Sequence, residues 1–251
     1  MKAFIIFLLC MTCSLITQGQ NRKGLNGATI TPPKFIRIPG SMSATQEQEF
    51  QSIDDYMKTH VSYPAEALKR YKYGTEVIGF TVTPQGEVSD ISIINSVASE
   101  IDEEVTAVLK TTNCMWKPGY INEEAVPMEK EISVVFKLEE QSVTEIVERA
   151  RVDFTRACEM LLLKQKPRQA LKYFDRGIML LPKDRTFLAL RGLTRYDTGD
   201  KEGAIRDWTR IKQLGGTEGE EYMQQLRTLN GYEDLLITMK GYEEMSALLS
   251  K

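Results

Sequence analysis

Few residues of this 251-residue chain have types and spacings suited to chemistry. The single histidine, His60, gives a catalytic triad or a histidine-based metal site little to work with, and its setting places it at a helix end. Asp102, Glu103 and Glu104 could act as paired carboxylates, but their spacing is typical of a helix start, where the helix dipole favours negative charge. Neither a glycine-rich phosphate loop nor a nucleophile motif occurs. We therefore expect no catalytic residue, no metal and no cofactor, and predict that the protein is not an enzyme.

The composition narrows the classes of partner. Lys and Arg total 32 and Asp and Glu total 35, so the net charge is −3. That balance offers no basic surface large enough to indicate nucleic acid binding. Hydrophobic residues make up 42% and charged residues 27% of the chain, which is typical of a folded, water-exposed protein. We infer no small-molecule substrate and expect protein partners.

The first segment predicts export. Lys2 precedes a mostly apolar run from Ala3 to Ile16, and Thr17-Gln18-Gly19 offers a small-x-small cleavage site, so residues 1–19 are predicted to be a secretory signal peptide. The alternative is an uncleaved membrane anchor, although the run is short of the roughly 20 residues that a span needs. Lipid modification at Cys13 is disfavoured by the residues before it. Cleavage would leave Cys114 and Cys158, which we interpret as two lone buried thiols rather than a disulfide.

The elements that follow have distinct periods. Residues 20–45 are rich in Gly and Pro and are predicted to be a linker. Phe50, Ile53, Met57 and Val61 repeat at helical spacing. Tyr63-Pro64 then ends that helix, because proline disfavours helix at the residue before it. A second short helix is expected from Ala65 to Tyr71.

A hairpin comes next. Ile78, Phe80 and Val82 alternate, Thr83-Pro84-Gln85-Gly86 has the composition of a turn, and Val88 to Ile94 is rich in β-branched residues. Ser99-x-x-Asp102 predicts a capping box for a helix that runs to Thr112. Trp116-Lys117-Pro118 breaks that pattern, and we expect Trp116 in the core. A last strand is predicted from Glu131 to Leu138, so residues 46–139 form an α+β module with a small antiparallel sheet.

From about Val143 the helical period continues to the end of the chain, which predicts an all-α domain over residues 143–251. Small and aromatic residues recur there 34 positions apart, which is typical of helix–turn–helix repeat arrays. Pro182 ends the first unit and Gly215-Gly216 the second, and Thr238 and Tyr242 continue the register in degenerate form, as expected for C-terminal capping helices. The matched pairs are Ala170 with Ala204, Phe174 with Trp208, Cys158 with Gly192, and Leu162 with Tyr196.

Residues from about 38 to 138 resemble the C-terminal domain of the TonB family, in the form common in Bacteroidetes-type proteins. The resemblance is carried by Tyr63-Pro64 with Ala67, Gly74, the hairpin with its Gly86 turn, Ser96, Ile101-Asp102-Glu103, and Trp116-Lys117-Pro118. Residues from about 151 to 216 are similar to two tetratricopeptide repeats. Their signature is Ala170, Phe174 and Pro182, then Arg191-Gly192, Tyr196, Gly199-Asp200, Ala204 and Trp208.

The TonB resemblance implies a periplasmic domain that docks on outer-membrane receptors and transmits inner-membrane energy to them. The implied contact is strand addition, in which a receptor segment pairs with the open edge of the last strand. The residues that this assigns to the partner-binding edge are Glu131, Ser133, Val134, Val135 and Lys137. Among them, Ser133, Val135 and Lys137 are expected to face outward and to tune specificity.

The chain departs from the usual TonB pattern, since it has no long proline-rich spacer and it carries an appended helical domain. An alternative function is therefore an exported scaffold that binds proteins without a transport role. Its repeats would hold a peptide or a helix in their groove. The N-terminus discriminates between these two functions, because cleavage near Gly19 favours the scaffold and a retained anchor favours the transducer.

Overall fold

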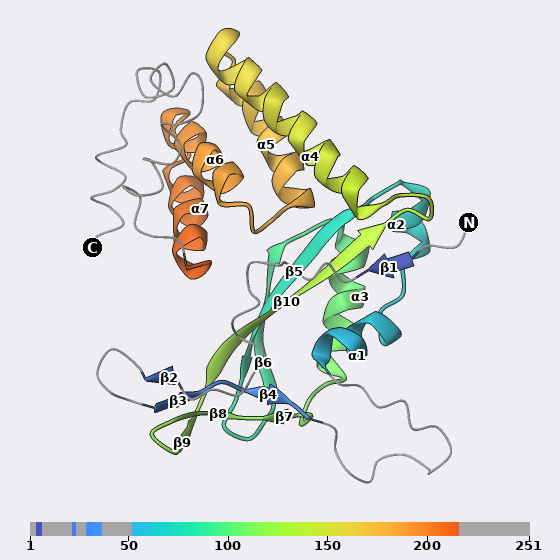
Figure 1. Ribbon diagram of the computed structural model, residues 1–251, viewed down its shortest axis with the longest axis vertical. Coiled ribbons are helices and arrows are strands. Elements are labelled where there is room, and N and C mark those ends of the chain that lie inside the picture. Colours follow the sequence, from blue (N-terminus) through green and yellow to red (C-terminus); the bar gives the residue numbers. More distant parts are fainter. Residues whose placement is uncertain (1–3, 7–21, 24–28, 37–51, 216–251) are drawn as a thin grey trace. The chain divides into compact units, whose positions relative to one another are not determined.

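The structure, a computed structural model, describes residues 4–6, 22–23, 29–36 and 52–215 of the chain (Figure 1). Inter-residue contacts divide the chain into two compact units, Met1–Gln141 (unit 1) and Ser142–Lys251 (unit 2). Within the described ranges no helix is both long enough and apolar enough to cross a membrane. The expected signal peptide lies outside the described residues except for Phe4–Ile6.

Unit 1 is built on a four-stranded antiparallel sheet in the order β1-β10-β5-β6. The hairpin expected from the sequence supplies β5 and β6, and the expected last strand becomes β10, which begins three residues earlier than predicted. The strands are β1 (Phe4–Ile6), β5 (Gly74–Val82), β6 (Val88–Asn95) and β10 (Met128–Lys137).

Three helices belong to this sheet: α1 (Ile53–His60), α2 (Ala65–Lys69) and α3 (Ser99–Lys110). Ser52 caps α1 by accepting the N–H of Asp55 on its hydroxyl. Tyr63 and Pro64 separate α1 from α2, and α2 ends two residues before the predicted Tyr71, which adopts a left-handed φ of 52°.

The core of unit 1 lies between the sheet and these helices. Side chains of β5 and β10 on the helix side are buried together with one face of α3, as hydrophobic alternation predicts. These core residues are Ile78, Phe80, Val82, Ile132, Val134, Phe136, Ile101, Val105 and Leu109.

The opposite face of β5 is buried as well, which overturns one expectation. Thr75 and Val77 are 7% and 0% exposed, although they alternate with the helix-side residues. Val135 of β10 lies opposite Thr75 and is only 2% exposed. The prediction that Val135 presents its side chain to solvent is therefore wrong, because a strand buried on both faces also buries the same-face residues of its neighbour.

The predicted Ser99–Asp102 capping box is also wrong. The N-cap of α3 is Ala98, which makes no side-chain cap hydrogen bond, and Ser99 is already the first helical residue. The Ser99 hydroxyl bonds to Glu100 instead, and Asp102 accepts hydrogen bonds from the Ser96 hydroxyl at 2.9 and 3.0 Å. The helix thus begins one residue earlier than a Ser99 cap requires.

The segment predicted as a linker contains strands. It pairs with the chain that follows α3, in the sheet β2-β3-β8-β9 and the ribbon β4-β7. Phe35 packs its ring against Trp116 and Tyr56, at centroid distances of 5.2 and 5.6 Å. Strands of two or three residues carry no detectable period, so the sequence pattern could not reveal them. They are β2 (Arg22–Lys23), β3 (Thr29–Thr31), β4 (Lys34–Phe35), β7 (Trp116–Lys117), β8 (Gly119–Ile121) and β9 (Glu124–Val126).

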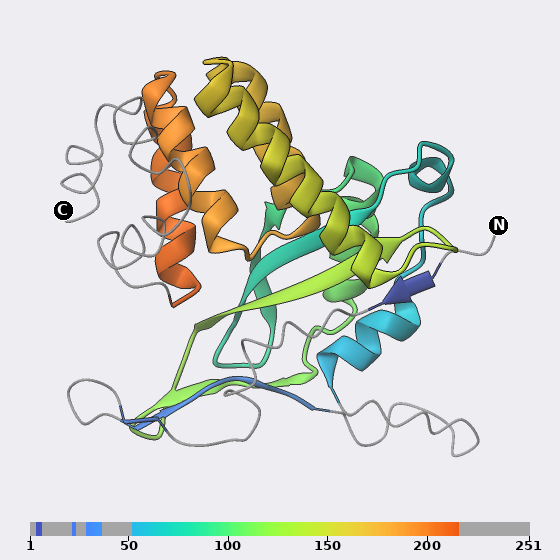
Figure 2. The ribbon, with the colours of Figure 1, turned by 45° about the horizontal axis from the view of Figure 1, so that its top comes forward.

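Unit 2 is helical throughout its described part. A capping box between Ser142 and Glu145 starts it, since each side chain bonds the backbone N–H of the other. In Figures 1 and 2, α4 lies along α5 and α6 along α7. The elements are α4 (Val143–Cys158), the π-helical turn η1 (Glu159–Leu163), α5 (Pro167–Leu180), α6 (Arg185–Asp197) and α7 (Lys201–Gln213).

Two helices of unit 2, α5 and α7, begin one predicted repeat period apart. Pro167 and Lys201, the first residues of α5 and α7, are 34 positions apart. Ala170 and Ala204 are 0% exposed, and the Phe174 and Trp208 side chains are also buried. The predicted capping residues Thr238 and Tyr242 lie outside the described residues.

Candidate functional site

The hairpin fixes the direction of the backbone donors in the sheet. Val82 and Val88 face each other across it, and the Val88 N–H donates away from the sheet, to Asn113 Oδ1 at 3.0 Å. The Thr83 N–H donates to the Glu87 carbonyl at 2.9 Å, as expected beside a non-hydrogen-bonded pair. The Val82 N–H therefore points toward β10.

The pairing of β5 with β10 then gives the direction of each backbone N–H along β10. It runs without a register shift from Met128 opposite Val82 to Phe136 opposite Gly74. Since donors alternate along an antiparallel strand, Met128 and Val134 donate toward β5. Glu129, Ser133 and Val135 direct their N–H groups to the outer side of β10.

The outer side of β10 already accepts one strand. β1 pairs there in antiparallel register, with Ile6 opposite Val135 and Phe4 opposite Lys137. In the described part of the chain, strand pairing on this side is confined to Val135, Phe136 and Lys137. Strand pairing on the outer side therefore stops short of the N-terminal half of β10, which holds Glu129.

The structure separates the five predicted edge residues. Val134 and Val135 are buried, and Glu131, Ser133 and Lys137 are half-buried. The Ser133 hydroxyl is enclosed and makes no hydrogen bond within the described ranges. Lys137 Nζ donates to the Gln141 carbonyl at 3.1 Å, so its charge lies at the end of the strand. The outer side of β10 therefore offers backbone groups to a partner, and not a row of exposed side chains.

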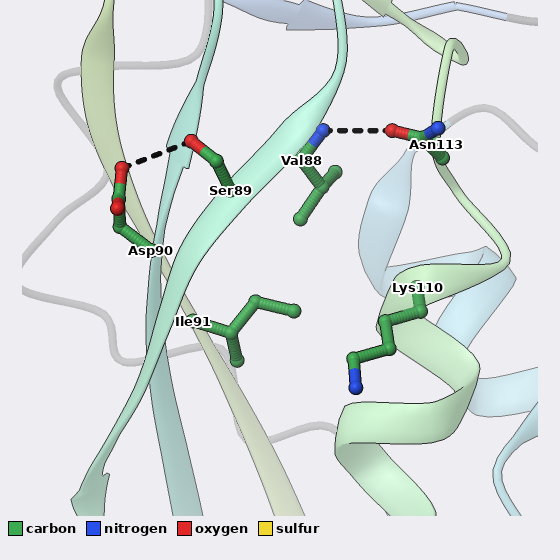
Figure 3. Close-up of a pocket in the computed structure, with 6 residues that line it drawn as sticks. All are labelled: Val88, Ser89, Asp90, Ile91, Lys110 and Asn113. Carbon is green, nitrogen blue, oxygen red and sulfur yellow. Dashed lines mark hydrogen bonds between the residues drawn. The ribbon is translucent and has the colours of Figure 1, made fainter.

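The other edge of the sheet, β6, is blunted. The Asn113 amide oxygen accepts the Val88 N–H (Figure 3). The register of β6 shifts between Ser89 and Ser92. Asp90, within that bulge, has a left-handed φ of 47°. Bulges and side-chain caps are devices that protect sheet edges from further pairing. A surface cavity of about 460 Å³ beside this edge is lined by Val88, Ser89, Asp90, Ile91, Lys110 and Asn113.

Tyr63, of the Tyr63-Pro64 motif, packs on the helix-side face of β10. Its ring packs edge-on against Phe136 at 5.2 Å, and its hydroxyl donates to the Lys72 carbonyl. Burial raises the pKa of the Tyr63 hydroxyl to about 12, so it stays a donor at neutral pH. Pro64 is the N-cap of α2. Tyr63 therefore packs on the strand, whereas Pro64 begins α2.

Gly86, in the hairpin turn, lies against the backbone of Trp116. Gly86 has a φ of +79°, and a Cβ there would lie 2.2 Å from the Trp116 carbonyl oxygen. Trp116 is buried, and its Nε1–H donates to Thr112 Oγ1 at 3.1 Å. Pro118, half-buried, separates β7 from β8. Trp116 thus lies in the core, as expected.

Unit 2 contains ion pairs that the sequence pattern did not reveal. Asp207 of α7 accepts hydrogen bonds from Arg191 and Arg195 of α6, at 2.6 and 3.0 Å. Arg191 also donates to Asp175 of α5 at 3.0 Å, which joins three helices. Asp153, on α4, is 1% exposed and is held by Arg176 of α5. A count of charges cannot reveal such pairs, because they form between turns of different helices.

The thiols and possible metal ligands suggest no further chemistry. Cys114 and Cys158 are both free thiols; Cys114 is exposed, so the expectation that it is buried is wrong. Burial raises the pKa of the Cys158 thiol to about 11, which makes it a poor nucleophile. Among the described residues, no group of three or more His, Cys, Asp and Glu side chains could hold a metal ion.

Comparison with protein families identifies one segment of the chain. A family described as the Gram-negative bacterial TonB protein C-terminal matches residues 59–138. That stretch runs from the end of α1 to the end of β10 and therefore contains the hairpin, α3 and β10. Residues 59–138 form a TonB-type C-terminal domain. No curated protein and no solved structure matches the chain.

Proposed function

We propose that the protein is an exported coupling protein that binds a segment of an outer-membrane receptor by strand addition to β10. The observation that supports this most directly is the asymmetry of the sheet. β10 pairs with an antiparallel strand on its outer side, whereas β6 is capped by Asn113 and bulged at Asp90. The TonB-type domain over residues 59–138 supports a role in energy transduction across the cell envelope.

In this mechanism the backbone supplies most of the affinity. A receptor segment would pair with the outward donors of β10, which include Glu129, Ser133 and Val135. It would pair on the outer side of β10, where β1 pairs in this structure. Lys137 would act as a rim charge, which chiefly affects the association rate.

Two adjacent valines test this mechanism. Val135→Pro removes an outward donor and Val134→Pro an inward one, and both side chains are buried, at 2% and 0% exposure. We expect Val134→Pro to break the ladder with β5 and to cost roughly 3 kcal/mol or more, by analogy with proline in regular structure. Val135→Pro should lower the stability of the domain less than Val134→Pro does, and it should abolish receptor capture.

The measurements are thermal unfolding of each variant and affinity capture from Gram-negative envelope extracts, with outer-membrane receptors identified by mass spectrometry. Lys137→Glu serves as a control and should change capture only modestly. Undiminished receptor capture by a folded Val135→Pro variant would rule out strand addition at this edge. Recovery of soluble periplasmic proteins alone would contradict the receptor role.

A second candidate function is an exported scaffold in which tetratricopeptide-type repeats bind a peptide or a helix. The 34-residue spacing of α5 and α7 and the buried Ala170 and Ala204 favour repeats of this type. N-terminal sequencing of the mature protein discriminates between the two functions. Cleavage after Gly19 with no membrane retention favours the scaffold, and an intact N-terminus in the membrane fraction favours the transducer.

A further inference from the structure

Glu76 occupies an unusual position in the central strand. Its side chain is 0% exposed and lies on the helix side of β5, opposite Val134 of β10. One oxygen, Oε2, accepts the backbone N–H of Val97 at 2.9 Å. The other, Oε1, is buried and receives no hydrogen bond from any donor in the described part of the chain. An ionised carboxylate in this position would lack most of the solvation that water provides.

The group that Glu76 faces is another carboxylate. Asp102, in the first turn of α3, accepts from Ser96, the neighbour of the Val97 that bonds to Glu76, and it raises the pKa of Glu76. Both oxygens of Asp102 accept from the Ser96 hydroxyl. Two ionised carboxylates only repel each other, whereas a protonated carboxyl can donate to an ionised one. A single proton would therefore give Oε1 of Glu76 its missing partner.

We propose that Glu76 is protonated at neutral pH and that its Oε1 hydroxyl donates to Asp102, so that one shared proton fastens β5 to the start of α3. The neighbours of Glu76 on the helix side of β10 are apolar: Ile132, Val134 and Phe136. Tyr63, which packs on Phe136, is neutral, and among the residues that the structure describes Asp102 is the charged group that raises the pKa of Glu76. Burial first, and Asp102 second, raise the pKa of Glu76 to about 8 against its ordinary 4.5.

The consequence is a domain that weakens as the solution becomes alkaline. The folded state holds the proton more tightly than the unfolded state, so the contribution is complete below pH 4.5 and is lost as the pH rises to about 8. Release of one proton on unfolding raises the unfolding equilibrium constant by at most about tenfold per pH unit in that range. Most stabilising carboxylates give the opposite slope.

The test uses the full chain and reads the proton directly. At pH 6.5, infrared difference spectra of wild type against Glu76→Gln should contain the carbonyl band of one protonated carboxylic acid. The amide signal of Val97, which bonds to Glu76, should titrate in NMR spectra with a midpoint above pH 7. Glu76→Gln should abolish that titration and flatten the alkaline loss of stability. Glu103→Gln, an exposed change on the same helix, should alter neither.

A second substitution keeps the proposal testable if Glu76→Gln folds poorly. Asp102→Asn removes the negative charge that opposes ionisation of Glu76, so the Val97 midpoint should move to lower pH. The proposal is overturned if wild type lacks the protonated-acid band, if the Val97 amide titrates near pH 4.5, or if Asp102→Asn leaves its midpoint unchanged. None of these outcomes depends on receptor binding.

Discussion

Gly86 lies where the hairpin turn meets the backbone of Trp116. Its φ of +79° suits glycine, and a Cβ would meet the Trp116 carbonyl oxygen at 2.2 Å. We expect Gly86→Ala to lower the free energy of unfolding by at least about 2 kcal/mol, because a strained φ and a backbone clash add together. Chemical denaturation monitored by circular dichroism measures this.

Gly199→Ala is the matched control. Gly199 also has a positive φ, of +95°, but nothing lies within 4 Å of the Cβ position. It should therefore show the conformational cost without the clash. Equal losses in the two variants would mean that the Trp116 contact is relieved by a small backbone shift.

Individual residues differ in how well the sequence predicts their structural role. Gly86 was predictable, because Thr83-Pro84-Gln85-Gly86 has the composition of a turn and Gly86 N–H indeed bonds to the Thr83 carbonyl. Glu76 was not, because its role depends on a carboxylate 26 positions away in α3. Val135 was misplaced for a related reason, since alternation indicates two faces but does not say whether both are buried.

At the scale of elements, a helix or strand can be predicted from the sequence when it is long enough to show a hydrophobic period. The hairpin of unit 1 has a long alternating apolar pattern and was expected close to its observed bounds, and the helical period was expected from about Val143, where α4 begins. β3 and β4 were not, because their two or three residues are ordered by partners near residue 120. The direction of the β10 donors was equally hidden, since it follows from the pair Val82–Val88 and the Asn113 cap.

The contact between α5 and α6 offers a test of packing in the helical unit. A Cβ at Gly177 would lie 2.0 Å from Phe187 Cε1. The Phe187 ring cannot yield easily, because it packs against Phe154 and Phe174 at 5.2 and 6.4 Å. We expect Gly177→Ala to destabilise unit 2 by roughly 1–3 kcal/mol, although alanine favours helix by about 1 kcal/mol.

A double substitution checks the cause of that loss. Phe187→Leu shortens the side chain that the new methyl would meet. In the Phe187→Leu background, Gly177→Ala should therefore cost less than it does alone, as measured by a thermal double-mutant cycle. Strictly additive losses would show that the ring is not the obstacle.

At the scale of the whole molecule, the change of period near residue 140 was the feature that separated a mixed module from a helical one. The structure adds a physical account of that junction. The Gln141 N–H donates to the Leu138 carbonyl, and Lys137 Nζ donates to the Gln141 carbonyl, so the end of β10 closes in a turn. A new capping box at Ser142 then starts α4 independently of that turn.

The tip of this turn should be the site at which the chain is cut into its two units. Glu139 and Glu140 are exposed and lie at the end of unit 1, just before the boundary between Gln141 and Ser142. Limited digestion with a glutamate-specific protease should therefore release a stable C-terminal fragment that begins at Glu140 or Gln141 and keeps the Ser142 cap. Mass spectrometry gives the fragment's start, and circular dichroism shows whether it remains helical. The double substitution Glu139→Gln and Glu140→Gln removes the cleavage site without changing the cap, so it should slow the cut selectively. If the wild-type chain resists cleavage here while sites inside α4–α7 are cut, the two units unfold together rather than separately.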